Sequence, residues 1–429
     1  MACVKKMLFF FLCFSLFLMA PIITTARNIL AVKNEPQTSL SEILIAMSTK
    51  DLEEEEEPAE IPVTEEKPIS KEPDEVERII DQYLQWLTLE QKIGQRFISN
   101  IQGKELSYDI VRLIQNEYIG GVILYPWNIE DRKQVKELTT AIQQKAIENA
   151  PPLHLFICVD QEGGRVRAFK LKEVTRFPAP YYWGQYNDPA YIESAAYIVC
   201  REIAELGCNM NFAPVLDVYG KPDNSIIGDR SMGKDPEAIG IYGINYIRGA
   251  EKAGVISVVK HFPGHGSTVI DSHLDLPIVD MTEAELIEQD AKPFKMVIEN
   301  GAEAVMTSHV LYRLVDPEYP ATLSVYILRK ILREKFDFQG VIVSDGLSMG
   351  ALSKNYEIAE TLRLLFKAGI DLILVHSQYD VSNLKRTILD LYETGEITED
   401  EINEGVRRIL RLKLKYRLLP LEIEQESIY

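Results

Sequence analysis

An apolar run leads directly into a cluster of titratable residues in the stretch Gly254-Val255-Ile256-Ser257-Val258-Val259-Lys260-His261-Phe262-Pro263-Gly264-His265-Gly266, and Asp271-Ser272-His273 follows shortly after. Three of the six histidines of the chain therefore lie between positions 261 and 273. A (β/α)8 barrel presents its functional residues at the rim, where a buried strand ends and a loop begins. The stretch therefore predicts a barrel strand with functional side chains at its end.

Eight short apolar runs recur along the chain, and they predict the strands of such a barrel. The runs are continuously apolar rather than alternating, which is typical of strands that are buried on both faces. The predicted strands are residues 96–98, 121–125, 155–159, 211–216, 255–259, 304–307, 341–343 and 371–375.

Helical patterns lie between these runs. Thr88 is placed to cap one helix, and Thr282-Glu283-Ala284-Glu285 forms a capping box at the start of another. We expect helices at 76–87, 89–95, 189–206, 235–253, 282–299, 324–335, 356–368 and 399–415, the last packed on the outside. Strands that alternate with helices predict the α/β class and a single (β/α)8 TIM-type barrel. The alternative is an open doubly wound sheet, but no glycine-rich phosphate fingerprint follows the first predicted strand.

The chain before residue 75 differs in composition from the predicted barrel. Lys5 and Lys6 precede an apolar segment at 7–23, so residues 1–26 are predicted to be a signal peptide or an N-terminal anchor. Residues 27–74 are acidic and predict a disordered linker. Residues 75–429 then hold the barrel with its C-terminal helix. We expect an extracytoplasmic protein (periplasmic, secreted or membrane-anchored) that contacts the membrane only through a possible N-terminal anchor.

Composition limits the partners of the chain. The net charge is −19, and no basic cluster of the kind that binds nucleic acid is present in the sequence, so nucleic acid is not an expected partner. Three cysteines follow residue 26, namely Cys158, Cys200 and Cys208, without metal-ligand spacing. A Cys200–Cys208 bridge is the alternative to three free thiols. We expect a monomer.

Polar residues stand at the C-terminal ends of six predicted strands. In a barrel such positions indicate catalysis or substrate binding, because the carboxyl ends of the parallel strands all meet at one rim. For any single position a structural role is an equally good explanation, but six in phase make a shared structural explanation improbable. The six strand ends carry Asp160, Asp217, Lys260 with His261, His309, Asp345 and His376.

Several motifs resemble those of family 3 glycoside hydrolases, in the N-acetylglucosaminidase (NagZ-like) branch. The resemblance runs from about Leu87 to Leu419 and is most specific at Lys260–His273. The other matching segments are 87–95, 159–165, 211–217, 230–233 and 343–352.

The resemblance implies a retaining exo-β-N-acetylglucosaminidase that acts on GlcNAc-terminated saccharides derived from peptidoglycan or chitin. Asp345 is then the nucleophile that forms a covalent glycosyl-enzyme, His273 the acid/base, and Asp271 the residue that orients His273. The resemblance also implies that the sugar is held by Asp160, Arg165, Arg230, Lys260 and His261. It implies neither a metal nor a cofactor. His265 is expected to support its loop, and His154 and His376 are expected to be structural.

Other functions stay open at this point. They are a β-glucosidase, a phosphorylase that transfers GlcNAc to phosphate, a non-catalytic sugar-binding protein, and a zinc hydrolase in which Asp271 and His273 share a metal with His261 or His265. The chain also departs from the family pattern at three positions. Ala168 stands where the family has Arg, Ser267 where Asp is common, and Gly346 where a second Asp is frequent.

Overall fold

The computed structural model describes residues 73–220, 226–268 and 271–420, which belong to one compact unit, 69–429. The predicted signal segment (1–26) and almost all of the predicted acidic linker (27–74) lie outside the described residues, so their bounds stay predictions. No helix among the described residues is both long and apolar enough to cross a membrane.

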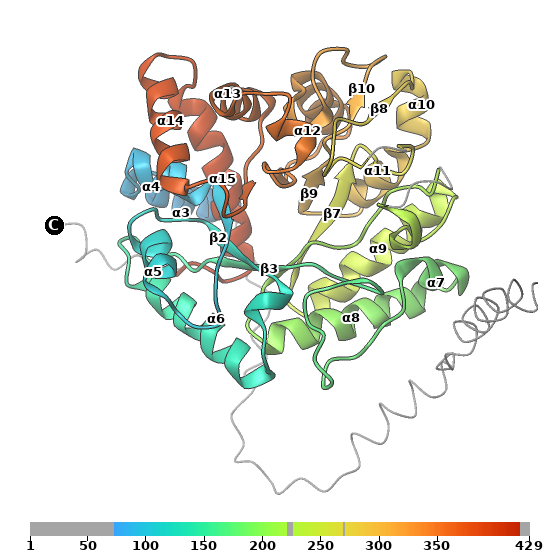
Figure 1. Ribbon diagram of the computed structural model, residues 1–429, viewed down its shortest axis with the longest axis horizontal. Coiled ribbons are helices and arrows are strands. Elements are labelled where there is room, and N and C mark those ends of the chain that lie inside the picture. Colours follow the sequence, from blue (N-terminus) through green and yellow to red (C-terminus); the bar gives the residue numbers. More distant parts are fainter. Residues whose placement is uncertain (1–72, 221–225, 269–270, 421–429) are drawn as a thin grey trace, which may run out of the picture. The chain divides into compact units, whose positions relative to one another are not determined.

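Eight parallel strands form one sheet in the order β11-β9-β7-β6-β3-β2-β1-β12 (Figure 1). A bridge between Val343 and Leu372 joins its two outer strands, so the sheet is nearly closed. Each predicted apolar run corresponds to one strand, which confirms the (β/α)8 barrel and makes the open-sheet alternative wrong. The strands are β1 (Phe97–Asn100), β2 (Gly121–Leu124), β3 (Phe156–Val159), β6 (Met210–Asn211), β7 (Ile256–Phe262), β9 (Ala304–Thr307), β11 (Val341–Val343) and β12 (Ile373–Val375).

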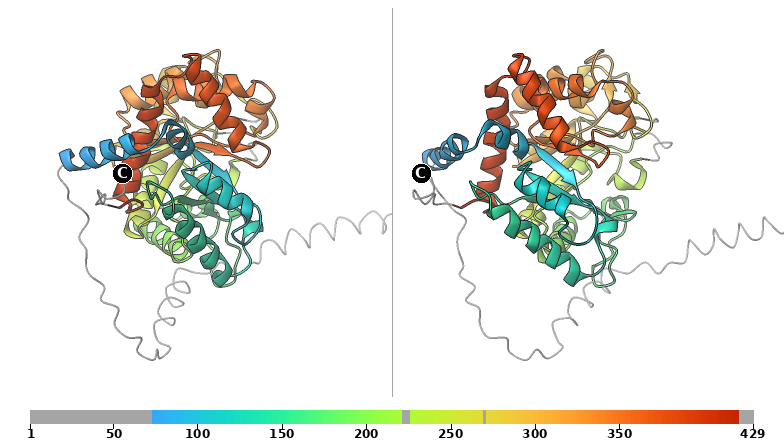
Figure 2. Two further views of the ribbon diagram at one scale, coloured as in Figure 1. Left: turned by 90° about the vertical axis from the view of Figure 1, so that its left-hand side faces the viewer. Right: turned by 60° about the vertical axis from the view of Figure 1, so that its left-hand side comes forward.

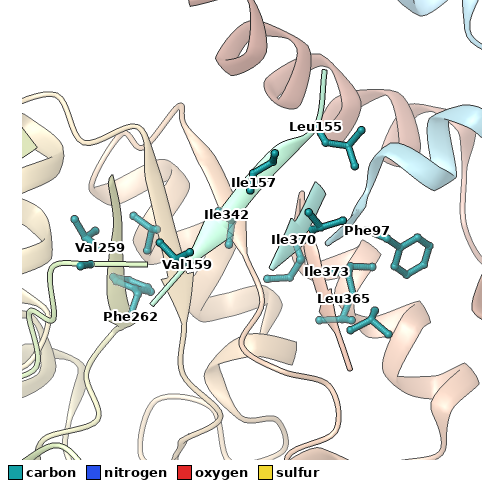
Figure 3. Packing of buried hydrophobic residues seen from close by; sticks show 14 of the residues in the cluster. Phe97, Leu155, Ile157, Val159, Val259, Phe262, Ile342, Leu365, Ile370 and Ile373 are labelled. Atoms are coloured by element: carbon teal, nitrogen blue, oxygen red, sulfur yellow. The ribbon is translucent and has the colours of Figure 1, made fainter. Parts of the chain in front are cut away.

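The apolar runs are continuous because alternate residues of each strand face two different cores. In β3, Phe156 and Cys158 belong to the cluster inside the barrel, whereas Ile157 and Val159 belong to the larger cluster between the strands and the helices. Figure 3 shows Ile157, Val159, Ile342 and neighbouring side chains of that larger cluster. Burial on both faces is what the sequence pattern predicts for parallel strands.

Helices surround the sheet (Figures 1 and 2). The cap predicted at Thr88 is present, because the Thr88 hydroxyl accepts from the Gln91 amide and the Gln91 side chain accepts from the Thr88 amide. The capping box predicted at Thr282 is present as well. The longer helices are α3 (Pro73–Trp86), α4 (Leu89–Gln95), α5 (Tyr108–Gln115), α6 (Arg132–Ile147), α8 (Pro189–Glu205), α9 (Pro236–Lys252), α11 (Lys292–Glu299), α13 (Ile358–Ala368), α14 (Val381–Glu393) and α15 (Glu399–Lys415), with a π-helix at Tyr326–Lys335. Short helices are α7 (Pro180–Gln185), α10 (Glu283–Glu288) and α12 (Gly350–Ser353).

The prediction of one continuous helix at 282–299 is wrong. Residues 282–299 form two helices, α10 and α11, because the backbone of Gln289 leaves the helical region (φ −116°, ψ −86°). Pro293, which has no backbone N–H, then stands in the first turn of α11. Between the two helices the side chain of Asp290 is buried and accepts hydrogen bonds from Ser267 and Tyr312.

The three cysteines of the described residues are free and buried. The Cys200–Cys208 bridge, which the sequence left as an alternative, is therefore not formed in this structure.

A buried ionic network ties the last helix to the barrel. The carboxylate of Asp371, which is fully buried just before β12, lies 2.7 Å from Arg333 Nη2 of the π-helix and 3.0 Å from Arg408 Nη1 of α15. It also accepts from the Ile342 amide of β11 at 2.7 Å. A single carboxylate therefore connects β11, the π-helix, α15 and the segment before β12.

We predict that Asp371→Asn lowers the free energy of unfolding by about 3–5 kcal/mol, because the substitution removes the counter-charge of the buried Arg333 and leaves Arg408 with Glu404 alone. Urea unfolding followed by circular dichroism measures this loss. Asp280→Asn is the matched control, since Asp280 pairs with Arg313 at 2.7 Å but both side chains are about half exposed. Its loss should stay below about 1 kcal/mol. Equal losses in the two variants would contradict a special role for the buried network.

Candidate active site

The carboxyl ends of β3 and β7 bring a compact cluster of charges together. Lys260 of β7 places its Nζ 2.6 Å from the Asp160 carboxylate and 2.7 Å from the Glu162 carboxylate. Arg230 donates two hydrogen bonds of 2.8 Å to the Glu162 carboxylate, from Nε and Nη2. The structure thus unites three predicted site residues, Asp160, Lys260 and Arg230, around a fourth residue, Glu162, to which the sequence interpretation gave no role.

Glu162 balances the two cations. Burial alone would raise the pKa of its carboxyl, but the charges of Arg230 and Lys260 and their hydrogen bonds lower that pKa to about 2. Glu162 is 1% exposed as a side chain, whereas Asp160 is 28% exposed. Asp160 is therefore the carboxylate of the cluster that an incoming ligand can reach, and Glu162 is its internal support.

Asp217 holds the histidine at the end of β7. Its carboxylate lies 2.6 Å from His261 Nδ1 and accepts from the backbone amides of His261 at 3.3 Å and His265 at 2.7 Å. Burial would raise the pKa of Asp217, but the neighbouring His261 lowers it. Because Nδ1 faces Asp217, Nε2 is the nitrogen of His261 that is left to meet a ligand.

The loop after β7 carries the predicted acid/base pair. Asp271 Oδ1 lies 2.8 Å from His273 Nδ1 and also accepts from the His273 amide at 2.8 Å. Burial opposes ionisation of Asp271, but these contacts lower the pKa of its carboxyl. The His273 side chain is 63% exposed. The ring is therefore oriented through Nδ1 while Nε2 stays available for proton transfer, as a general acid/base needs.

His265 supports this loop through contacts of its ring nitrogens, as expected. Its Nε2 lies 2.8 Å from Ser272 Oγ and its Nδ1 lies 3.0 Å from Thr268 Oγ1. Burial lowers the pKa of His265 to about 4, so the ring is neutral near pH 7. A neutral buried imidazole between two hydroxyl groups serves to fix the loop.

The loop docks onto the segment that carries Asp345. The Gly350 and Ala351 amides donate to the carbonyls of His273 and Ser272 at 3.1 and 3.0 Å, and Lys354 Nζ donates to the Leu274 carbonyl at 2.7 Å. Gly350 permits this approach, because a Cβ there would lie 2.6 Å from the Leu274 carbonyl oxygen. The loop that carries Asp271 and His273 and the segment that carries Asp345 are thus joined by backbone contacts.

Asp345 follows β11 directly and faces a group of histidines. Its Oδ1 accepts from the Gly346 amide at 2.7 Å, and the side chain is partly exposed. Burial would raise the pKa of Asp345, but His309, His261, the Gly346 amide and His273 hold it well below its usual range. The carboxyl is therefore ionised across the physiological range, as a nucleophile requires. It does not cap the following helix, because the N-cap of α12 is Met349.

Two rim histidines brace the Asp345 segment. His309, fully buried after β9, lies with Nε2 3.1 Å from the Gly346 carbonyl. His376, after β12, lies with Nε2 2.7 Å from the Tyr125 hydroxyl and Nδ1 3.1 Å from Ser348 Oγ. His376 therefore has the structural role that the sequence suggested. The part played by Tyr125 was missed, because an aromatic residue at the end of an apolar run gives no signal that separates it from the core.

Two departures from the family pattern have structural explanations. A Cβ at Gly346 would lie 2.6 Å from His376 Cε1, so the imidazole occupies the space into which a second aspartate would grow. The side chain of Ala168 is 4% exposed and belongs to the main hydrophobic core, so position 168 does not offer a guanidinium to the rim. At position 267, the serine hydroxyl donates to Asp290 Oδ1 at 2.9 Å.

Arg165 is more exposed than the other predicted sugar-binding residues. Its side chain is 48% exposed, and Nε lies 2.9 Å from Asp229 while Nη2 donates to the Ile226 carbonyl at 2.6 Å. These contacts brace the turn that carries Arg230. A direct contact of Arg165 with sugar stays a prediction.

The zinc alternative needs three or more ligands around one point. Within residues 73–220, 226–268 and 271–420, no group of three or more His, Cys, Asp or Glu side chains has an arrangement that could hold a metal ion. Four histidines of this part of the chain instead contact a carboxylate, hydroxyl groups or a backbone carbonyl, namely His261, His273, His265 and His309.

Comparison with known proteins agrees with this geometry. The family described as the glycosyl hydrolase family 3 N-terminal domain matches residues 88–412, most of the chain. The chain belongs to glycosyl hydrolase family 3.

Individual family 3 relatives carry hexosaminidase names. The chain is 32% identical over 329 residues to β-hexosaminidase A of Pseudoalteromonas piscicida, covering 72% of this chain but only 55% of that protein. It is 35% identical over 298 residues to a β-hexosaminidase of Methylobacillus flagellatus, covering 67% of this chain and 83% of that protein. A solved family 3 β-N-acetylglucosaminidase from Paenibacillus sp. strain FPU-7 superposes with a TM-score of 0.75 at 39% identity, covering 77% of this chain and 63% of that one. The chain thus spans little more than half the length of the first of these relatives.

Asp290 connects the loop after β7 to the neighbouring wall of the barrel. Ser267 donates to its carboxyl at 2.9 Å, and the Tyr312 hydroxyl lies 3.2 Å from the carboxyl and 2.9 Å from the Gly264 carbonyl. Burial raises the pKa of Asp290 from 3.8 to about 6. The folded protein therefore holds a proton on Asp290 at pH values where the unfolded chain has released it.

We predict that Asp290→Asn flattens the pH dependence of stability. The contribution of a raised carboxyl pKa is complete below the unfolded value of 3.8 and is lost as the pH rises through about 6. The variant does not titrate there, so between about pH 4 and pH 7 it should gain up to about 3 kcal/mol relative to the parent protein. Thermal and urea unfolding across this range measure the change. Asp280→Asn, which removes an exposed carboxylate, is the control, and a constant offset for Asp290→Asn would contradict the prediction.

Proposed function

We propose that this protein is a retaining exo-β-N-acetylglucosaminidase that cleaves terminal β-linked GlcNAc. The observation that carries the proposal is the docking of the Asp271–His273 pair onto the segment of an ionised Asp345. An ionised carboxylate, on a segment joined to the loop of an oriented imidazole, supplies a nucleophile and an acid/base at one site. The names of the hexosaminidase relatives support the same activity.

The reaction proceeds in two displacements. Asp345 attacks the anomeric carbon and forms a glycosyl ester, while His273 Nε2 gives its proton to the departing oxygen of the aglycone. His273, now neutral, then takes a proton from water, and that water attacks the anomeric carbon and releases Asp345. Asp271 stabilises the imidazolium at Nδ1 in each protonated stage. Two inversions at the same carbon retain its configuration.

The charged cluster at β3 and β7 is suited to hold the terminal sugar. Asp160 and Lys260 offer an acceptor and a donor 2.6 Å apart, a spacing suited to neighbouring hydroxyl groups, and His261 offers Nε2. Arg230 sits behind them, bound to Glu162. We propose GlcNAc-terminated fragments of peptidoglycan or chitin as substrates, outside the cytoplasm, with the protein acting as a monomer.

Transfer of the glycosyl group to phosphate is a second candidate. It is favoured by the acid/base, because an imidazole repels an anionic acceptor less than a carboxylate does. In this case phosphate oxygen, instead of water, attacks the glycosyl ester and releases Asp345. Product analysis with an aryl β-N-acetylglucosaminide in phosphate buffer decides the question, since from this substrate GlcNAc 1-phosphate forms only by transfer and GlcNAc only by hydrolysis.

We predict that Asp345→Ala lowers kcat on aryl β-N-acetylglucosaminides by at least about 10⁴-fold, because no other carboxylate takes the place of the nucleophile. His273→Ala should lower kcat about 10²- to 10⁴-fold on substrates with poor leaving groups. The loss should be far smaller on dinitrophenyl substrates, because dinitrophenolate departs without a proton. Steady-state kinetics on a leaving-group series measures both effects.

Added azide provides a further readout. With His273→Ala it should accelerate turnover of the dinitrophenyl substrate and yield a β-glycosyl azide, because azide attacks the glycosyl ester without a base. Glu137→Ala, which changes an exposed residue in the middle of α6, should behave as the parent protein. An inert parent protein that is folded, or an Asp345→Ala variant with full activity, would contradict the proposal.

A further inference from the structure

A pair of stacked aromatic rings stands beside the charged cluster. Tyr125 follows β2 directly, and Leu124 of β2 is in register with Val159 of β3. The two strands therefore place Tyr125 and Asp160 side by side as they reach the rim. The next turn, Pro126–Asn128, carries Trp127.

Tyr125 borders the proposed sugar site. Its hydroxyl lies 2.7 Å from His376 Nε2. Burial raises the pKa of Tyr125 strongly, and the nearby charges of Asp160 and Asp345 raise it further, so the phenol remains a neutral hydrogen-bonding group. The ring is thus close to both the proposed nucleophile and the proposed hydroxyl-binding carboxylate.

The turn that carries Trp127 is held firmly. Asn128 is fully buried, accepts from the Tyr125 amide at 2.9 Å through Oδ1, and donates through Nδ2 to the carbonyls of Ile101 and Gly103 at 3.1 and 2.7 Å. These three hydrogen bonds fix the backbone on both sides of Trp127. Binding of a ligand to this ring therefore costs little conformational entropy, because the turn is already ordered.

Trp127 offers a large open aromatic face. Its ring is stacked on Tyr125, with centroids 4.5 Å apart and an interplanar angle of 23°, and the residue is 51% exposed. One face of the indole is thus covered by Tyr125, and the residue leaves substantial apolar area in water. An exposed tryptophan on a rigid turn beside a polar pocket is typical of a binding surface.

We propose that Trp127 forms a subsite for the sugar on the leaving-group side of the scissile bond. The inference rests on the proposed function. Tyr125 lies next to the charged cluster that would hold the terminal sugar, and Trp127 extends the same stack toward solvent, where the aglycone of an exo-acting enzyme must lie. A β-linked pyranose with equatorial substituents presents an apolar face of axial C–H groups. That face stacks on the open side of the indole, so the preferred substrate is a saccharide and not a glycoside of a small alcohol.

The test compares a disaccharide with a glycoside that lacks a second ring. Trp127→Ala should lower kcat/KM on GlcNAc-β1,4-GlcNAc about 10- to 30-fold and change kcat/KM on methyl β-GlcNAc less than twofold. Trp127→Phe keeps an aromatic face and should retain the disaccharide activity within about threefold. Tyr197→Ala removes a partly exposed aromatic from the middle of α8 and is the matched control, which should change neither substrate.

Each result has a distinct meaning. A disaccharide-specific loss with rescue by Trp127→Phe supports the subsite, and repeating it with GlcNAc-β1,4-MurNAc shows which aglycone sugar is favoured. Equal losses on both substrates, or no loss on either, overturn the subsite while the hydrolase proposal stands. A folded parent protein that turns over none of the three substrates overturns the proposed function, and the subsite with it.

Discussion

The arrangement of the rim depends on one buried carboxylate, that of Asp217. It is fully buried, and it accepts from the His261 ring, the His261 amide and the His265 amide. These bonds turn His261 toward the ligand and set the direction in which the chain leaves β7. Further along the same loop, His265 contacts Ser272 and Asp271 contacts His273. Removal of the charge would weaken the bonds to one imidazole and two backbone amides, at a cost larger than that of one hydrogen bond.

Charge balance at the rim explains why the carboxylates there can play different parts. Glu162 neutralises Arg230 and Lys260 inside the protein, so Asp160 stays available at the surface of the cluster. Asp345 has no lysine or arginine partner among its described contacts and is instead stabilised by histidines and the Gly346 amide. Ion pairing immobilises a carboxylate, whereas a field of imidazoles keeps it ionised and leaves its oxygens free to react.

Much of the fold could be predicted because burial on both faces leaves a strong mark in the sequence. The eight apolar runs correspond to the eight strands. The fourth run, 211–216, predicts a longer strand than β6, which ends at Asn211 before Pro214, a residue without a backbone N–H. The break at Asp290 could not be predicted, since the side-chain bonds that favour it come from Ser267 and Tyr312, distant in sequence. For the site, strand ends identified Asp160, Lys260 and Asp345. Glu162, His309 and Tyr125 acquire their parts only from partners that the barrel brings together.

The glycine after Asp345 links the proposed nucleophile to the aromatic pair Tyr125 and Trp127 through His376. A second aspartate at position 346 would place two like charges in sequence neighbours and raise the pKa of Asp345. In this chain His376 fills that space, and its Nε2 meets the Tyr125 hydroxyl on which the Trp127 stack depends. Loss of one carboxylate therefore has two physical effects. It removes a charge that would oppose ionisation of Asp345, and it makes room for the imidazole that bonds to Tyr125, the base of the proposed Trp127 subsite.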